Sequence, residues 1–553
     1  MAPTPGVLYV TMQPASSLPT AQFQDWYNNE HGPTRLRLPF IENGFRYRAK
    51  DLKEAGSKEM PEWMAIYDIT DMAELTSETY TNLRTDAVKS QREKDTMKQI
   101  AVDRRIFDLA GGREAKAFKP LEDLDAESAG AELVAISLSL HPGKEQELDR
   151  WYDEEHFGMI TKVPGWLRSR RFVNSSIESK DRVEWLTIHE FAAKNAIGGE
   201  EHKAAASTPW AKDIMSNVVQ ERRRRDYRLY YTFGPAPRDL QWLPSADAVP
   251  FTSPDGKRRT IPAAQPDGPA IESYITTNDN VVLPYRLEGS SDPDAPLIVL
   301  SNSILVEWGI WDGFVAAFLS APQNRKYRIL RYSTRGRSSA CGDQPITVDV
   351  LASDVVALLD ALRVPQAAAV VGVSLGGATA LATALQHPAR VAAFVSCDTS
   401  AKSPTGNRKT WGERIAVAEK EGARASSGES VVGAQLAELT VRRWFVEESY
   451  DGGKTEAEIA RVKAMVRSNS LDGFKKSVEA LFEYDLTAPM KRCAVKGAFV
   501  VGGGDGVLPH TMKDMAAALG HGAVYKVIDG AGHLPMVEKA REFADFVTAF
   551  LAE

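Results

Sequence analysis

Apolar and polar residues alternate along the first 235 residues in a pattern that occurs twice. Segments 7–13 ("VLYVTMQ") and 133–140 ("LVAISLSL") both alternate as half-buried β-strands do. Each is followed by apolar residues at helical spacing, at 23–27 and 148–152, and then by further alternating strands. The pattern predicts two α+β halves, residues 1–119 and 131–234, each running β-α-β-β-α-β, with the acidic connector 120–130 between them.

From residue 271 the pattern changes to short, wholly apolar strands such as "PLIVLSNS" and "AAAVVGVS", with helical segments between them. Strands that are buried on both faces and joined by helices are typical of a mostly parallel sheet, so residues 271–553 are predicted to form an α/β domain. Between about 401 and 487 charged amphipathic helices replace the strands, which predicts a helical cap. Residues 235–270 contain eight prolines and are predicted to be an extended linker.

Charge and cysteine content narrow the range of partners and compartments. A net charge of −7 gives no general attraction to nucleic acid or to anionic membranes. The three cysteines form neither a disulfide framework nor a zinc pattern, and no apolar stretch reaches the ~18 residues that span a bilayer. We expect a cytoplasmic protein that acts on a small molecule; the sequence leaves a homo-oligomer open.

The segment "VVGVSLGGA" places Ser374 between Gly372 and Gly376, directly after an apolar strand and before an apolar helix. Glycines on both sides permit the tight strand-to-helix turn that exposes a nucleophilic serine. The alternative, a glycine-rich nucleotide-binding loop, lacks both the dinucleotide spacing and the Lys-Ser/Thr of a P-loop. The motif therefore predicts serine-dependent hydrolysis.

A serine hydroxyl needs a base and an acid that orients the base. His533 lies in "DGAGHLPMVE" after the last strand and is the predicted base. Asp505, in the loop after the penultimate strand, is the predicted acid, and Asp398, one strand earlier, is its competitor. The backbone amide of Leu375, the residue after the nucleophile, is a predicted oxyanion donor.

The α/β region resembles the α/β-hydrolase superfamily, and "LSNSI", "GIWDGF" and "GVSLGG" resemble its 3-oxoadipate enol-lactonase branch. This resemblance implies a second oxyanion donor at the Ile304 amide and hydrolysis of a lactone or ester, without a metal or organic cofactor. Asn302, Trp308 and Trp311 are expected near the mouth of the pocket, with ordinary packing as the alternative for the two tryptophans. Hydrolysis of a C–C bond in a 1,3-dicarbonyl is the alternative reaction.

The repeated "WYNNEHG" and "WYDEEHFG" end in His31 and His156. These residues are expected near the C-terminus of a helix, where the helix dipole favours an imidazolium, either as packing residues or as acid–base groups in a cavity. The motif resembles the EthD family of dimeric α+β barrels, which implies a tandem ferredoxin-like pseudo-dimer. The resemblance implies isomerase, decarboxylase or cyclase chemistry, with His31 as the favoured site; the alternative is a non-catalytic module for binding or oligomerisation.

A basic run, Glu221–Arg225, stands before the last strand of the second half. Aromatic residues do not alternate with its cations, so it is predicted to end a helix rather than to bind nucleic acid.

Overall fold

The computed structural model describes residues 3–53, 60–120, 130–177, 183–262, 268–450 and 455–553. The chain divides into two compact units, Met1–Pro237 and Arg238–Glu553. Most of the connector 120–130 lies outside the described residues.

The N-terminal unit contains two halves of similar element order. The first half comprises β1 (Gly6–Pro14), α1 (Thr20–Trp26), η1 (Tyr27–His31), α2 (Gly32–Leu36), β2 (Ile41–Ala49), β3 (Trp63–Ile69), η3 (Met72–Thr76), α3 (Glu78–Thr81), η4 (Asn82–Arg84), α4 (Gln91–Met97) and β4 (Ile100–Glu114). The second half comprises β5 (Glu132–Leu140), α5 (Glu145–Trp151), η7 (Tyr152–His156), α6 (Phe157–Ile160), β6 (Trp166–Asn174), β7 (Glu184–Phe191), α7 (Glu200–Ala205), α8 (Pro209–Asp213), η8 (Ile214–Val218) and β8 (Val219–Thr232). Both halves follow the β-α-β-β-α-β order that the hydrophobic pattern predicts.

The eight strands close into one barrel in the order β1-β3-β2-β8-β5-β7-β6-β4. Antiparallel pairing of β2 with β8 and of β4 with β6 joins the two halves, so neither half leaves a free sheet edge. Alternation along each strand gives the sheet two apolar faces. In β1, Val7 and Tyr9 face the barrel interior together with residues of the second half, whereas Leu8 and Met12 face the helices outside.

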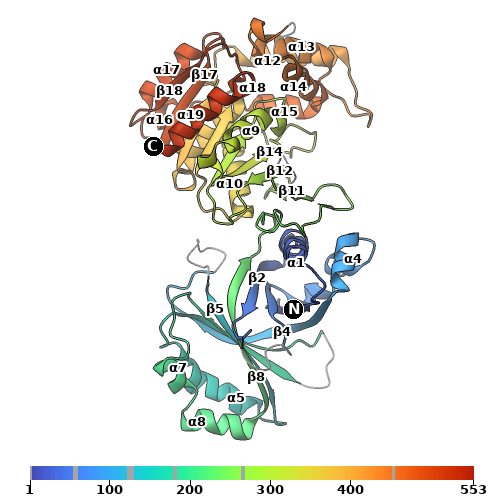
Figure 1. Ribbon diagram of the computed structural model, residues 1–553, viewed down its shortest axis with the longest axis vertical. Coiled ribbons are helices and arrows are strands. Elements are labelled where there is room, and N and C mark those ends of the chain that lie inside the picture. Colours follow the sequence, from blue (N-terminus) through green and yellow to red (C-terminus); the bar gives the residue numbers. More distant parts are fainter. Residues whose placement is uncertain (1–2, 54–59, 121–129, 178–182, 263–267, 451–454) are drawn as a thin grey trace. The chain divides into compact units, whose positions relative to one another are not determined.

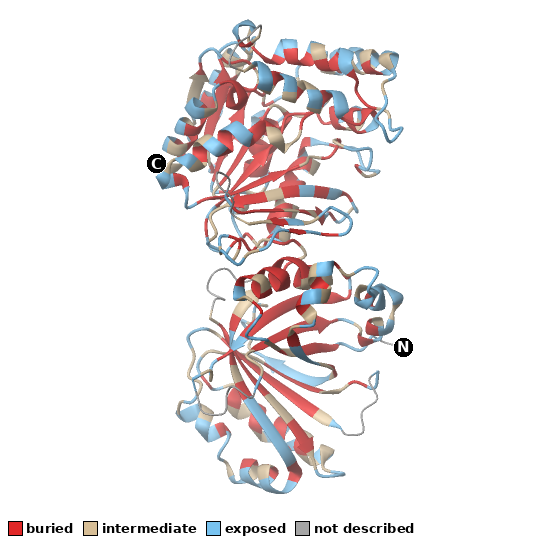
Figure 2. Cartoon of the chain, turned by 45° about the vertical axis from the view of Figure 1, so that its right-hand side comes forward, coloured by how far each residue is buried: buried red, intermediate tan, exposed pale blue. Residues whose placement is uncertain are grey.

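The C-terminal unit is built on a ten-stranded sheet of order β18-β17-β16-β15-β13-β14-β12-β11-β10-β9. Its strands are β9 (Phe251–Thr252), β10 (Arg259–Ile261), β11 (Ala270–Thr276), β12 (Val282–Gly289), β13 (Leu297–Ser301), β14 (Arg328–Tyr332), β15 (Ala369–Val373), β16 (Ala393–Cys397), β17 (Lys496–Gly502) and β18 (Val524–Ile528). From β14 to β18 in this sheet order, β13 included, the strands run parallel. Every residue of β13, β14, β15 and β16 is buried, as the apolar runs predict. Figure 2 shows these buried strands beneath helices that expose their outer faces.

Helices cover this sheet and form a cap on it. The covering helices are η9 (Trp308–Trp311), α9 (Asp312–Ser320), η10 (Pro322–Asn324), α10 (Val348–Ala361), α11 (Leu375–Gln386), η11 (Pro388–Arg390), α16 (Thr487–Met490), α17 (Leu508–Ala518), α18 (Pro535–Glu538) and α19 (Ala540–Ala552). Between β16 and β17 the cap comprises α12 (Asn407–Glu421), α13 (Ala434–Trp444), η12 (Glu447–Ser449), α14 (Glu456–Ser468) and α15 (Leu471–Glu479). Arg337 joins the sheet to this cap by donating to the Met465 carbonyl at 2.6 Å and to Ser468 Oγ at 2.7 Å.

Two local predictions differ from the structure. The run Glu221–Arg225 does not end a helix but belongs to β8, because β8 pairs with β5 along this whole stretch. Alternate residues of the run face opposite sides, and the buried Arg225 is neutralised by Asp51 at 2.8 Å. Within 235–270, the short strands β9 and β10 extend the ten-stranded sheet instead of remaining irregular. Among the described residues no helix combines the length and the apolar character that crossing a membrane requires.

Candidate active site

Ser374 lies at a sharp turn between β15 and α11. Its backbone has φ 58° and ψ −119°, a left-handed region that non-glycine residues rarely occupy. Such strain persists only where the surrounding structure imposes it. Here β15 ends at Val373 in the middle of the parallel sheet and α11 begins at Leu375, so the turn presents the serine at the carboxyl ends of the strands.

Two glycines around Ser374 are required by close backbone contacts. A Cβ on Gly372 would lie 1.9 Å from the Gly376 carbonyl oxygen, and one on Gly376 would lie 2.2 Å from the Ser301 carbonyl oxygen. The absence of side chains thus lets helix α11 begin directly against β13 and β15.

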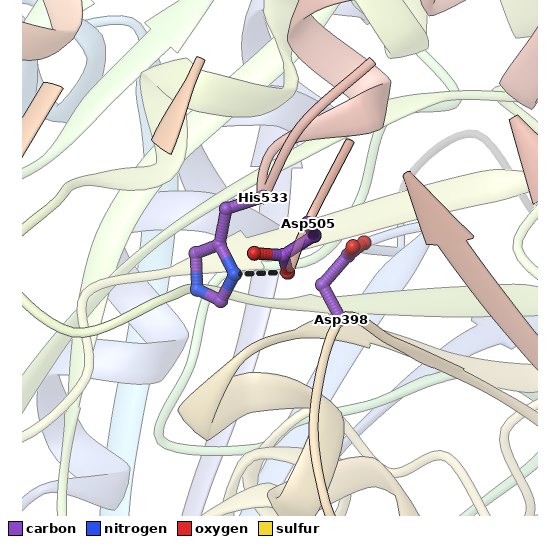
Figure 3. A group of neighbouring side chains, drawn as sticks. All are labelled: Asp398, Asp505 and His533. Carbon is purple, nitrogen blue, oxygen red and sulfur yellow. Dashed lines mark hydrogen bonds and ion pairs between the residues drawn. The ribbon is translucent and has the colours of Figure 1, made fainter. Parts of the chain in front are cut away.

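His533 and Asp505 form a hydrogen-bonded pair in the loops after β18 and β17 (Figure 3). The distance from His533 Nδ1 to Asp505 Oδ2 is 2.7 Å, and both side chains are largely buried. Because Nδ1 is held by the carboxylate, the other ring nitrogen, Nε2, is available as a proton acceptor. Ser374, Asp505 and His533 line the same cavity.

Asp398, the competing acid, lies next to Asp505 but has a different state (Figure 3). It is 1% exposed, and its Oδ1 accepts a hydrogen bond from the Gly502 amide at 2.9 Å. Burial, and then the charge of Asp505, raises the pKa of Asp398 well above its ordinary value. Burial therefore favours the neutral form of Asp398, and Asp505 is the aspartate that holds His533.

One ligand atom from each of Asp398, Asp505 and His533 lies within 4.8 Å of the others, a spacing that a metal ion could use. A metal would have to take Nδ1 away from Asp505 and deprotonate a buried acid whose pKa is raised. The chemistry of these groups therefore favours proton sharing over metal binding.

The cap and Glu538 fix the loop that carries His533. The His533 ring stacks on Trp444 of α13 at 5.6 Å, and its amide donates to the Trp444 carbonyl at 2.6 Å. Glu538 accepts from the Gly532 amide at 2.6 Å and from Ser449 Oγ at 2.6 Å. The histidine is thus held from both sides, which limits the orientations that its ring can adopt.

The two predicted oxyanion donors also reach this cavity. Leu375 and Ile304 line it, and the Leu375 amide belongs to the first turn of α11, where backbone N–H groups lack partners within the helix. The strand-end loop that carries Ile304 is strained at the next residue, since Leu305 has φ 71°. Two residues from separate elements therefore border the cavity that contains Ser374.

The structure places Asn302 and Trp311 elsewhere than expected. Both are buried; Trp311 Nε1 donates to Asn302 Oδ1 at 2.9 Å, and Asn302 Nδ2 donates to the Tyr332 carbonyl at 2.7 Å. Neither residue lines the cavity, and Trp308 does not line it either. The alternative of ordinary packing is what the structure shows, because Asn302 satisfies the buried indole N–H.

The cavity has a volume of about 210 Å³, and its cap side carries residues that sequence reasoning did not single out as a set. Arg414 lies over the Trp411 ring at 4.3 Å, and Arg443 lies 5.9 Å from the same ring. Within the described part of the chain neither arginine has an ion-pair partner. Arg443 is accessible to water but surrounded by protein, and this desolvation, followed by the charge of Arg414, lowers its pKa to about 10. The signal in the sequence was weak, since "VRRWF" is more typical of a solvated helix face than of a carboxylate site.

Residues 298–546 match the model of the Alpha/beta hydrolase family. These residues form an α/β-hydrolase domain. The chain is a hydrolase of the type that acts on esters or lactones. The α/β-hydrolase domain lies within the ten-stranded unit, so its match covers about half of the chain and leaves the barrel outside.

Curated relatives and solved structures of similar sequence include enol-lactonases. The chain is 27% identical over 278 residues to 3-oxoadipate enol-lactonase 2 of Acinetobacter baylyi, covering 50% of this chain and 95% of that protein. It is 26% identical over 277 residues to 3-oxoadipate enol-lactonase 1 of the same organism, covering 50% and 96%. The crystal structure of the enol-lactonase from Burkholderia xenovorans LB400 is 28% identical, with 51% of this chain and 100% of that chain covered and a TM-score of 0.44.

In the barrel, the structure corrects the prediction for His31 and His156. Neither is at a helix end, because η1 and η7 are π-helical turns that continue into α2 and α6. Neither lies in the barrel interior. Both are on the outer, helix-covered face, where the ring centroids of His31 and Trp26 are 4.6 Å apart and those of His156 and Trp151 are 4.4 Å apart.

An imidazolium is also not what this environment favours. Burial is the largest effect and lowers the pKa of His156 to about 4. Burial and then Arg35 lower the pKa of His31, although Glu93 accepts a hydrogen bond from its Nδ1 at 2.9 Å. The expected effect of a helix dipole is absent because no helix terminus lies at either residue.

Proposed function

We propose that Ser374 is the nucleophile of a lactone or ester hydrolase, with His533 as base and Asp505 as the acid that orients it. The observation that carries this proposal is the strained backbone of Ser374 in a cavity shared with the His533–Asp505 pair. A structural serine would have no reason to retain a left-handed φ between two glycines.

In the proposed mechanism, His533 Nε2 takes the proton of Ser374 Oγ as the oxygen attacks the substrate carbonyl. The carbonyl oxygen becomes negative and is held by the amides of Leu375 and Ile304. The C–O bond of the ester or lactone then breaks, and His533 returns the proton to the leaving oxygen. Water, deprotonated by His533, attacks the acyl-enzyme and releases the acid and free Ser374.

The substrate class proposed is an anionic enol-lactone or ester. Arg414 and Arg443 contribute two positive charges to the same cavity as Ser374, and the surrounding protein partly desolvates both, so an anionic ligand would offset that cost. Trp411, between them, offers a flat apolar surface. A planar ring that carries a carboxylate would meet both features, and the similarity to proteins named enol-lactonase supports this class.

For the N-terminal unit we propose an EthD-like pseudo-dimer, with halves 1–119 and 131–234, that carries out a linked isomerisation, decarboxylation or cyclisation. The duplicated Trp-Tyr-x-x-Glu-His motif and the β-α-β-β-α-β order of both halves support this proposal. The alternative is a barrel that only binds or oligomerises. Residues 235–270 would then connect it to the hydrolase domain, 271–553, with its cap at about 401–487.

The test of the hydrolase uses a fluorophosphonate probe and paired substrates. We expect the probe to label Ser374, and Ser374→Ala to abolish both labelling and hydrolysis. A lactone that carries a carboxylate should be hydrolysed better than its methyl ester. A 1,3-dicarbonyl is the comparison substrate for C–C cleavage. Labelling at another residue, or full hydrolysis by Ser374→Ala, would overturn the proposal.

The cap arginines have a matched control. Arg443→Gln and Arg414→Gln should each raise KM for the anionic substrate about 10-fold, as expected for a lost charge-assisted hydrogen bond, and leave a neutral ester unchanged. Arg442→Gln is the control, because Arg442 pairs with Glu438 on the exposed side of α13 at 2.9 Å. An equal effect of all three variants on both substrates would contradict the assignment.

A further inference from the structure

The second half of the barrel encloses a cavity of about 80 Å³ on the outer face of its sheet. Strands β5, β7 and β8 form one wall, and helices α5 to α6 and α7 to η8 form the other. The lining is mostly apolar, but five basic side chains reach the cavity: His156, His189, His202, Arg222 and Arg224. An apolar cavity with a few polar groups is typical of a small-molecule site.

His189 presents an unpartnered ring nitrogen to this cavity. It is 2% exposed, and its Nε2 has no hydrogen-bond partner among the described residues. Its Nδ1 lies 2.7 Å from Ser169 Oγ, which accepts a hydrogen bond from Trp166 Nε1 at 2.8 Å. Ser169 is buried and its hydroxyl hydrogen needs an acceptor, which Nδ1 supplies when the ring proton lies on Nε2. His189 thus offers a free N–H donor.

His156 presents the complementary group. Its Nδ1 donates to the Ala205 carbonyl at 3.2 Å, so the neutral ring keeps a lone pair on Nε2. The two rings lie 5.6 Å apart, centroid to centroid. Burial lowers the pKa of both histidines, which keeps both rings neutral near pH 7. One donor and one acceptor therefore face a common space.

Positive charge borders the same cavity on β8. Arg222 and Arg224 lie opposite Leu138 and Ile136 of β5, two residues that line the cavity. Arg224 is paired with Asp226 at 2.9 Å, whereas Arg222 has no ion-pair partner among the described residues. Arg222 is exposed at the rim, where it could hold a carboxylate without a buried charge.

Side chains fill the corresponding space in the first half. Tyr67 occupies the position of His189 and His31 that of His156, as the strand registers and the repeat show. His31 Nδ1 is bound to Glu93 at 2.9 Å, the Tyr67 hydroxyl donates to the Tyr27 hydroxyl at 3.4 Å, and Phe233 stacks on Tyr67 at 5.8 Å. The first half, whose His31 the sequence favoured as the site, is therefore packed, whereas the second half keeps a cavity.

We propose that the second half is a proton-transfer site for a small oxo acid, with His156 as the base, His189 as the donor to the oxo group and Arg222 as the carboxylate partner. His156 Nε2 takes a proton from the carbon next to the oxo group; the electron pair forms an enolate whose oxygen accepts from His189 Nε2–H. In an oxo acid with a C=C bond conjugated to this enolate, the double bond shifts as the same proton returns to its far carbon, which gives the isomer without a further reactant. This inference rests on the barrel role proposed above, but not on hydrolysis at Ser374.

The experiment measures exchange of the C3 hydrogens of 2-oxobutanoate for deuterium in D₂O by ¹H NMR, with the full chain. We expect the chain to accelerate exchange, and His156→Gln and His189→Gln to slow it about 100-fold, the usual contribution of an acid–base group. The matched first-half variants, His31→Gln and Tyr67→Phe, should retain it. Arg222→Gln should raise the concentration of half-maximal rate about 10-fold.

Ester hydrolysis at Ser374 is measured on the same preparations and reports folding and the other active site. Hydrolysis without exchange overturns the proton-transfer site and leaves the hydrolase intact; exchange without hydrolysis does the reverse. Equal loss of exchange in both halves' variants overturns the placement in the second half. Unchanged exchange in His156→Gln overturns the role of that residue.

Discussion

At the scale of single residues, identical side chains take different roles according to what lies next to them. Asp398 and Asp505 follow successive strands, yet the first is a buried neutral acid and the second orients His533. The sequence predicted this preference from the loop positions. The raised pKa of Asp398 could not be predicted, because it depends on burial and on the distance to Asp505.

The roles of the two aspartates can be distinguished by replacing each with asparagine, which has nearly the same shape. Asp505→Asn should lower kcat about 10³- to 10⁴-fold, because an amide cannot hold His533 in the tautomer that accepts the serine proton. Asp398→Asn should change kcat less than about 10-fold, since its amide oxygen can still accept from Gly502 and the group it replaces is neutral. Steady-state hydrolysis of one ester by both variants is the measurement. A larger loss in Asp398→Asn would reverse the assignment of the acid.

Because His156 is buried in its neutral form, the free energy of unfolding should depend on pH. Its pKa is about 4 in the folded chain against an ordinary 6.5, so between these values the unfolded chain binds a proton that the folded chain does not. The free energy of unfolding should therefore fall as pH decreases from about 6.5 to about 4, by up to ~3 kcal/mol in total. His189 acts in the same direction.

Urea unfolding of the barrel at pH 7 and pH 4.5 measures this effect. His156→Gln should reduce the difference between the two midpoints, whereas His510→Gln, which alters a side chain 84% exposed on α17, should not. A difference that stays the same in His156→Gln would show that the histidine is not buried in its neutral form.

At the scale of elements, the periodicity of apolar residues predicted the helices and strands that pack by one apolar face. It missed the strand that depends on pairing with a distant segment. The order of helices and strands along both halves and the turn at Ser374 could be predicted, because alternation and glycine positions encode them locally. The run Glu221–Arg225 has no apolar periodicity, and only its pairing with β5 makes it a strand. The π-helical turns at His31 and His156 likewise have no simple sequence signature, so a continuous helix was mistaken for a helix end.

The turn at Ser374 provides a test of close backbone packing. Gly376→Ala would place a Cβ 2.2 Å from the Ser301 carbonyl oxygen, so α11 must move away from β13. We expect a loss of about 1–3 kcal/mol in the free energy of unfolding and a lower kcat, since the Leu375 amide moves with the helix.

The control for this substitution is Gly412→Ala, in the exposed part of α12, where a new Cβ meets nothing within 4 Å. This change should stabilise the chain by about 0.5–1 kcal/mol through helix propensity and leave kcat unaltered. The measurements are the denaturant midpoints and the hydrolysis rates of both variants. Similar behaviour of the two glycines would show that the contact at Gly376 can relax freely.

At the scale of the whole molecule, each unit has its own hydrophobic core and its own candidate site. The barrel joins strands of both halves around one interior cluster, and the hydrolase domain buries its central parallel strands under helices. Two proposed sites on one chain would allow consecutive steps on one intermediate. A defined cavity in each unit gives each of these steps a place.

Separate cores predict two unfolding transitions in calorimetry, because cooperative units follow packed cores. A fluorophosphonate adduct at Ser374 should raise only the transition of the hydrolase domain, by at least about 2 °C, which corresponds to roughly 1 kcal/mol for a domain of this size. Saturating 2-oxobutanoate should raise only the other transition, and His189→Gln should remove that second shift. A single transition that responds to both ligands would show that the units unfold as one, and the two sites would then be coupled through the stability of the whole chain.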